Sequence, residues 1–105
     1  MLFMVIEHYR QQNAQAVYAR FAERGRQIPE GADFVASWVA ADMGRCFQIM
    51  RADDVTLLQR WVAAWSDLIQ FEIVPVAEGS ITAAALVGDT SSGATPPPAG
   101  PTAGR

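Results

Sequence analysis

Apolar runs and helical repeats alternate along the first 78 residues of the chain, and the changes of period mark the expected elements. Four short apolar runs suit β-strands: residues 2–9, 33–40, 45–50 and 71–76. The tight turn at Asp42-Met43-Gly44 joins the middle two runs as an antiparallel hairpin. Pro75 lacks an amide hydrogen for the ladder, so the last strand is expected at a sheet edge.

Two stretches repeat apolar residues at helical spacing. The first follows Asn13, a good N-cap, carries Val17 and Phe21 on one face, and ends near Gly25. The second opens at Asp53 or Asp54, either of which suits the positive end of a helix dipole. Its apolar positions follow the i, i+3, i+4, i+7 pattern: Leu57, Leu58, Trp61, Val62, Trp65, Leu68 and Ile69.

The predicted order is β-α-β-β-α-β, which is the split βαβ arrangement. The expected fold is therefore an α+β, ferredoxin-like sandwich, with a four-stranded antiparallel sheet and two helices on one face. This domain spans 1–78. Residues 79–87 are small and apolar and fit either a short helix or an extra edge strand. Residues 88–105 are mostly Gly, Pro, Ser, Thr and Ala, so we expect a disordered tail.

Side-chain alternation along the strands predicts how the sheet is covered. One face of the sheet is wholly apolar and is expected to carry the helices. The other is apolar at its centre, with polar side chains set into it: Glu7, Ser37, Gln48 and Glu72. Because such a face is too apolar to leave in water, the pattern predicts a homodimer through it. The face is expected to bear Val35, Val39, Val74 and Val76.

Charge and cysteine content narrow the expected partners and compartment. The chain has eight basic and eleven acidic residues, a net charge of −3, and no basic stripe of the kind that binds nucleic acid. Cys46 is the only cysteine, so no internal disulfide calls for an oxidising compartment. The apolar N-terminus is too short for a signal sequence or a membrane span. We expect a soluble, cytoplasmic protein without membrane or nucleic-acid partners.

Three stretches of sequence carry a resemblance to a known family. They are Tyr18–Arg26 with Pro29-Glu30-Gly31, then Ser37–Asp42 with Arg45–Met50, and Trp61–Leu68 with Phe71–Val76. Together they resemble the DUF3303 family of small proteins of unknown function, over nearly all of residues 1–78. The resemblance implies a fold close to the dimeric α+β barrels, which include small-molecule monooxygenases, isomerases and stress-responsive proteins. It implies no catalytic residue.

The predicted strand order, 4-1-3-2, brings charged side chains to one end of the sheet. Glu7 and His8 end the first strand, and Arg45 and Glu72 begin the third and fourth. His8 and Glu72 are candidate catalytic residues that move a proton, and Glu7 and Arg45 are candidate ligand-binding residues. The structural alternative is an ion pair in which Arg45 satisfies one of the two carboxylates.

Three tryptophans supply candidate apolar contacts. Trp38, Trp61 and Trp65 either belong to the core or line an aromatic pocket for a ligand. His8 has no second histidine or cysteine at ligand spacing, so we expect no metal and no cofactor. Cys46 has no base beside it in the sequence and suits a small buried apolar residue.

These observations favour a small-molecule-binding dimeric α+β barrel protein. Its expected ligand is a small apolar organic molecule, and its expected chemistry a cofactor-free monooxygenase-, isomerase- or cyclase-like reaction. The alternative is a non-enzymatic regulatory, stress-related or accessory interaction domain. A small molecule that co-purifies with the protein would favour the ligand-binding function. A fully packed interior without a pocket would favour the interaction domain.

Overall fold

The computed structural model describes residues 1–88 of the chain. The elements are β1 (Leu2–Tyr9), the 3-10 turn η1 (Arg10–Gln12), α1 (Ala14–Arg24), β2 (Ala32–Val39), β3 (Arg45–Ala52), α2 (Val55–Trp65), β4 (Ile69–Val76) and α3 (Gly79–Val87). They form two compact units, of which the first is Met1–Pro75 and the second begins at Val76. Apart from Gly88, the tail predicted at 88–105 lies outside the described residues.

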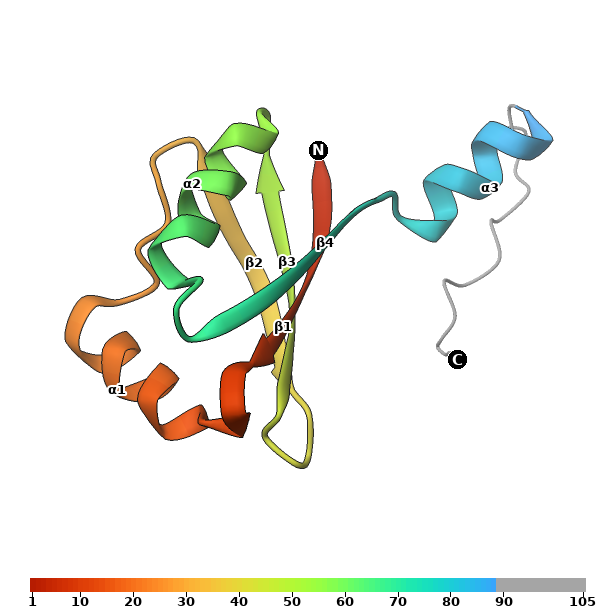
Figure 1. Cartoon of the computed structure of the whole chain (residues 1–105). Helices are drawn as coiled ribbons and strands as arrows, with labels where there is room; N and C mark the ends of the chain where they lie inside the picture. The colour runs from red at the N-terminus through yellow and green to blue at the C-terminus, as the bar shows by residue number, and fades with distance from the viewer. Residues whose placement is uncertain (89–105) are drawn as a thin grey trace. The chain divides into compact units, whose positions relative to one another are not determined.

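The Met1–Pro75 unit is an α+β fold consistent with a ferredoxin-like arrangement. Its antiparallel sheet has the order β2-β3-β1-β4, which confirms the strand order predicted from the sequence. Helices α1 and α2 lie on the same face of the sheet (Figure 1). Strand β4, which contains Pro75, lies at one edge of the sheet, as predicted. A proline has no amide hydrogen, so it is better tolerated in an edge strand than in a central strand bonded on both sides.

The helix ends form where the sequence predicts them. The Asn13 side chain accepts a hydrogen bond from the Ala16 amide at 3.1 Å and begins α1. Gly25, with φ +70°, ends that helix in a conformation that other residues adopt only under strain. The Asp54 carboxylate accepts from the Thr56 amide at 2.9 Å and begins α2.

The core lies between the sheet and the two helices. Helix α2 buries Leu58, Trp61 and Trp65 in it, as the helical spacing predicts, while Leu57 is half-buried. Met50 and Val5 meet this stripe from the sheet and are fully buried. Burying each such side chain contributes about 1.5–3 kcal/mol, so this layer supplies much of the stability of the domain.

The prediction of which sheet face meets the helices is wrong for β1 and β3. The buried side chains of β1 are Phe3, Val5, Glu7 and Tyr9. Their cross-strand partners on β3 include Met50, Gln48 and Cys46, which are also buried. The expected dimer face of these strands therefore meets the helices instead. A strand that is apolar on both faces does not specify which one turns inward, because a one-residue shift leaves its pattern intact.

Strand β2 departs from simple alternation at a register shift between Phe34 and Ala36. Phe34 pairs with Met50 on the helix side, whereas Ala36 and Trp38 pair with Ile49 and Phe47 on the opposite side. Val39 pairs with Cys46, so the prediction that it lies on the dimer face is wrong. An extra residue in a strand reverses the alternation beyond it, and the sequence carries no mark of the bulge.

The opposite side of the sheet is here named the open face. No helix of the Met1–Pro75 unit covers it. Its central side chains are apolar: Leu2, Met4, Ile6, Trp38, Phe47, Ile49 and Val74. Trp38 is 58% exposed and Val74 is 38% exposed, so the open face carries large apolar groups in contact with solvent.

The second unit contains α3, which decides between the two alternatives for residues 79–87 in favour of a helix. Its larger side chains, Ile81, Leu86 and Val87, are exposed. None of the helices within residues 1–88 is long and apolar enough to cross a membrane.

Candidate functional site

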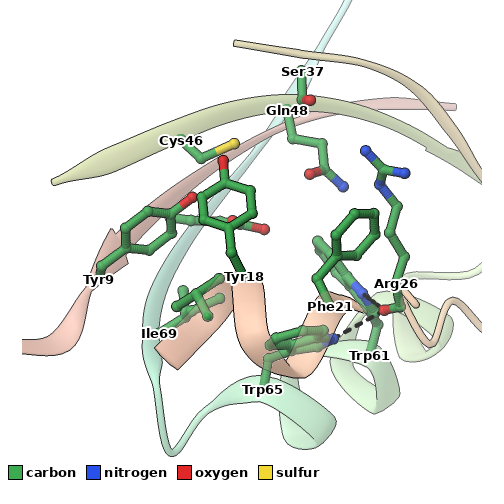
Figure 2. Close-up of a pocket in the computed structure, with 12 residues that line it drawn as sticks. Tyr9, Tyr18, Phe21, Arg26, Ser37, Cys46, Gln48, Trp61, Trp65 and Ile69 are labelled. Carbon is green, nitrogen blue, oxygen red and sulfur yellow. Dashed lines mark hydrogen bonds between the residues drawn. The ribbon is translucent and has the colours of Figure 1, made fainter. Parts of the chain in front are cut away.

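A pocket opens between the helix-facing side of the sheet and helices α1 and α2 (Figure 2). The empty space within it is about 480 Å³, including the part that opens to solvent. Residues from both strands and helices line it: Glu7, Tyr9, Val17, Tyr18, Phe21, Arg26, Ser37, Cys46, Gln48, Trp61, Trp65 and Ile69. Five aromatic rings and a few polar groups in one concave space are typical of a small-molecule site.

The loop between α1 and β2 is anchored by the two pocket tryptophans. The indole N–H groups of Trp61 and Trp65 both donate to the carbonyl oxygen of Arg26, each at 2.9 Å (Figure 2). Gly25 and Gln27, on either side of Arg26, have positive φ values of 70° and 59°. The two hydrogen bonds therefore hold the backbone of this loop and determine where the Arg26 side chain begins.

The Arg26 guanidinium lies over two aromatic rings. Its central carbon lies 3.7 Å from the centroid of the Phe34 ring and 5.0 Å from that of Phe21. Figure 2 shows the guanidinium on the side of the pocket where Gln48 and Ser37 project from the sheet. No ion pair or side-chain hydrogen bond within residues 1–88 engages it. The pocket thus contains a cation that lies over two aromatic rings and whose N–H groups have no acceptor among residues 1–88.

Glu7 brings a carboxyl group to the same pocket from β1. Its side chain is buried, with the residue only 6% exposed. Burial raises its pKa from 4.5 to about 7, although the positive charge of Arg26 and a hydrogen bond with Cys46 act in the opposite direction. A carboxyl group with this pKa exchanges a proton near neutral pH, which is the property required of a general acid or base.

The remaining polar groups around Glu7 stay protonated at neutral pH. Burial raises the pKa of the Cys46 thiol to about 11, so it is a poor nucleophile. Burial also raises the pKa of Tyr9, whose ring meets that of Tyr18 edge to face at 6.4 Å. The Cys46 thiol and the Tyr9 hydroxyl therefore act as neutral hydrogen-bond donors or acceptors, whereas Glu7 titrates near neutrality.

Residues 1–89 match the family described as a domain of unknown function, DUF3303. The chain belongs to the DUF3303 family. This match confirms the resemblance seen in the sequence and extends it through α3. No curated protein and no solved structure matches the chain. Among the described residues of this DUF3303 domain, no cluster of three or more His, Cys, Asp or Glu side chains is placed to hold a metal ion.

The structure divides the residues predicted from the sequence between two faces of the DUF3303 sheet. Glu7, Trp61 and Trp65 line the pocket. His8 and Arg45 lie directly opposite each other in the β1–β3 ladder, on the open face.

The other two predicted residues are also outside the pocket. Trp38 pairs with Phe47 on the open face, and Glu72 is exposed on β4. Consecutive residues of a strand point to opposite faces, so Glu7 and His8 do not share a site. The structural alternative is not observed either, because the ion pairs within residues 1–88 are Arg20–Asp67 and Arg24–Glu23.

Sequence reasoning missed several residues of the pocket. Tyr9 could have been predicted from the sequence, because it lies two residues beyond Glu7 on the same strand and therefore on the same face. Tyr18 and Phe21 lie in a helix whose other face is buried at Val17, so the pattern does not show that they line a cavity. Arg26 has no signal in the sequence, because its position depends on a loop held by residues of α2.

Proposed function

We propose that this DUF3303 protein binds a small, mostly apolar organic molecule in the pocket between its sheet and helices α1 and α2. The observation that carries the proposal is a buried carboxyl group, Glu7, in a cavity lined by aromatic rings. Burying a carboxyl group that makes no ion pair costs stability, so a chain that places one beside an open cavity is arranged for a ligand rather than for stability alone.

We also propose that Glu7 moves a proton on the bound molecule. As a carboxylate it accepts a proton from an acidic position of the ligand, and as a carboxylic acid it returns that proton elsewhere. Isomerase- and cyclase-like reactions, among the classes expected from the sequence, need such a transfer. Neighbouring Tyr9 and Tyr18 supply hydroxyl groups that donate hydrogen bonds to an oxygen on which charge develops.

Titration of the ¹⁵N-labelled protein with an uncharged aromatic probe, 2-naphthamide, tests the binding proposal. The chain has three tryptophans, and only two of them, Trp61 and Trp65, line the pocket. Their indole N–H signals should shift on titration while that of Trp38, on the open face, stays in place. Equal shifts of all three signals, or no shift either with this probe or with charged probes of the same shape, would contradict a site in this pocket.

We further propose that two copies pair through the open face. The apolar side chains at its centre support this, because removing them from water stabilises a complex by about 25 cal/mol per Å² of apolar area. A twofold axis would place the same face of each copy against the other. With a single cysteine, Cys46, the protein is suited to the reducing cytoplasm, where we propose that it works.

The second candidate function is a non-enzymatic interaction domain, and the exposed Trp38 and Val74 of the open face favour it. Native mass spectrometry of the purified protein separates the two. A dimer that carries a small molecule supports the binding function. A monomer or dimer without bound molecules, together with an unresponsive pocket in the naphthamide titration, supports the interaction domain.

A further inference from the structure

We infer that the ligand of this pocket is a planar aromatic carboxylate, with its anionic group held by Arg26 and its ring set among the aromatic side chains. The inference rests on the proposed binding function and names its ligand class. It is carried by the geometry of Arg26: a guanidinium beside a cavity, close to two aromatic rings and without a protein acceptor within residues 1–88.

The N–H groups of Arg26 are available to a ligand. Its central carbon lies 3.7 and 5.0 Å from the ring centroids of Phe34 and Phe21, which are apolar neighbours. A guanidinium donates hydrogen bonds along the edge of its plane, and no side chain within residues 1–88 accepts one from that edge of Arg26. Two parallel N–H groups along that edge match the two oxygens of a carboxylate.

The backbone of Arg26 is fixed independently of its side chain. Trp61 and Trp65 hold its carbonyl oxygen, and the rest of both indoles forms a wall of the pocket. The point at which the Arg26 side chain begins and the apolar wall are thus fixed relative to one another before a ligand arrives. Such preorganisation reduces the entropy lost on binding. It favours a rigid molecule in which a flat ring and an acidic group are directly joined.

Glu7 is the acidic side chain among the described residues that line the pocket. The carboxyl group lies in the same pocket, yet it makes no ion pair with Arg26. Buried among Tyr9, Cys46 and Tyr18, it is readily kept neutral, and a neutral carboxylic acid does not repel an incoming anion. The pocket with a protonated Glu7 has one net positive charge, which a monoanionic ligand neutralises.

Three probes of nearly equal shape and different charge test the inference: 2-naphthoate, 2-naphthamide and 2-naphthylmethylamine. Affinities are measured near neutral pH from the indole signals of Trp61 and Trp65. The anion should bind about tenfold or more tightly than the amide, since a charge-assisted hydrogen-bond pair replaces a neutral one. The amine should bind more weakly than either.

The variant Arg26→Gln should abolish the preference for naphthoate over naphthamide while it retains affinity for the amide. Gln keeps the backbone carbonyl that accepts the two indole bonds, so unchanged indole signals report an intact loop. Arg26→Lys keeps the positive charge but loses the two parallel N–H groups of the guanidinium, so it should retain only part of the preference for naphthoate over naphthamide. Arg24→Gln is the matched control, because Arg24 lies two residues away and is exposed, and it should leave the preference unchanged.

The outcomes separate the ligand class from the function itself. Equal binding of naphthoate and naphthamide, tighter binding of the amine, or an unchanged preference in Arg26→Gln and Arg26→Lys overturns the anionic ligand and leaves the binding pocket standing. Failure of all three probes to shift the Trp61 and Trp65 signals instead overturns the proposed function.

Discussion

Trp61 and Trp65 donate their indole N–H groups to one acceptor, the carbonyl oxygen of Arg26, at 2.9 Å each. Side chains four residues apart on a helix project from the same face, so two successive turns of α2 reach the same point. The acceptor lies 35 and 39 residues away along the chain. Helix α2, which packs against the core, therefore also positions the backbone of Arg26, the residue that carries the positive charge of the pocket.

The shared acceptor predicts that substitutions of the two tryptophans are coupled. Trp61→Phe and Trp65→Phe should each destabilise the protein by at least about 1 kcal/mol, from one lost hydrogen bond and a smaller ring. The double variant should lose more than the sum, because only then does the Arg26 carbonyl lack both donors. Urea unfolding of the four proteins measures the coupling, and additive losses would show that the carbonyl does not depend on the pair.

Glu7 predicts how stability depends on pH. Its pKa rises from 4.5 to about 7 on folding, so the folded state binds this proton more tightly than the unfolded state does. The contribution of Glu7 to the free energy of unfolding is therefore most stabilising below about pH 4.5. It declines as the pH rises to about 7 and stays constant above that pH. The decline amounts to roughly 3 kcal/mol, since each unit of pKa shift corresponds to about 1.4 kcal/mol.

Glu7→Gln removes this contribution. Its free energy of unfolding should vary less between about pH 5 and pH 8 than that of the wild type, by up to roughly 3 kcal/mol. Glu72→Gln is the control, because Glu72 is exposed on β4, and its pH profile should follow the wild type. Denaturant unfolding at several pH values measures both, and parallel profiles for Glu7→Gln and the wild type would exclude a titrating Glu7.

The proposed homodimer predicts that a charge on the open face separates the copies. Val74→Glu places a carboxylate at a position of that face which is 38% exposed, and burial of an unpaired charge opposes association. Sedimentation velocity at micromolar concentration should show a dimer for the wild type and a folded monomer for Val74→Glu. Val55→Glu, at an exposed position that begins α2, adds the same group elsewhere and should remain dimeric. A monomeric wild type would contradict the proposal.

The anionic ligand predicts that binding weakens as the pH rises. The groups that face Glu7 are Tyr9 from its own strand, Cys46 from β3, Tyr18 from α1 and Arg26 from the next loop. Burial raises the pKa of the first two well above neutrality, so Glu7 dominates the titration. Naphthoate affinity should fall about tenfold between about pH 6 and pH 8, as Glu7 ionises beside the bound anion.

Two comparisons isolate the role of Glu7 in that fall. Naphthamide has no charge, so its affinity should change little over the same range. Glu7→Gln should bind naphthoate with an affinity that no longer depends on pH. A fall of equal size in Glu7→Gln would assign the effect to another group.

Local sequence signals located most elements but not the pocket. Asn13, Gly25 and Asp54 mark helix ends because capping depends on a few neighbouring residues, and each acts in the structure as expected. One wall of the pocket could also be predicted, since Trp61 and Trp65 share the apolar stripe of α2. The prediction that Glu7 shares a site with His8 and Arg45 is wrong. Residues that lie at the same end of a sheet can still project from opposite faces of it.

The sequence by itself determined the order of the elements, the antiparallel sheet with the order β2-β3-β1-β4, and the stripe of α2 that closes the core. These features depend on periodicity and on short-range capping, both of which can be read along the chain. Only the tertiary structure decided that Glu7, and not His8, faces the helices, because β1 is apolar on both sides and long-range packing selects its face. Only the tertiary structure brought Arg26 to Glu7, through two hydrogen bonds that span more than thirty residues and leave no local pattern.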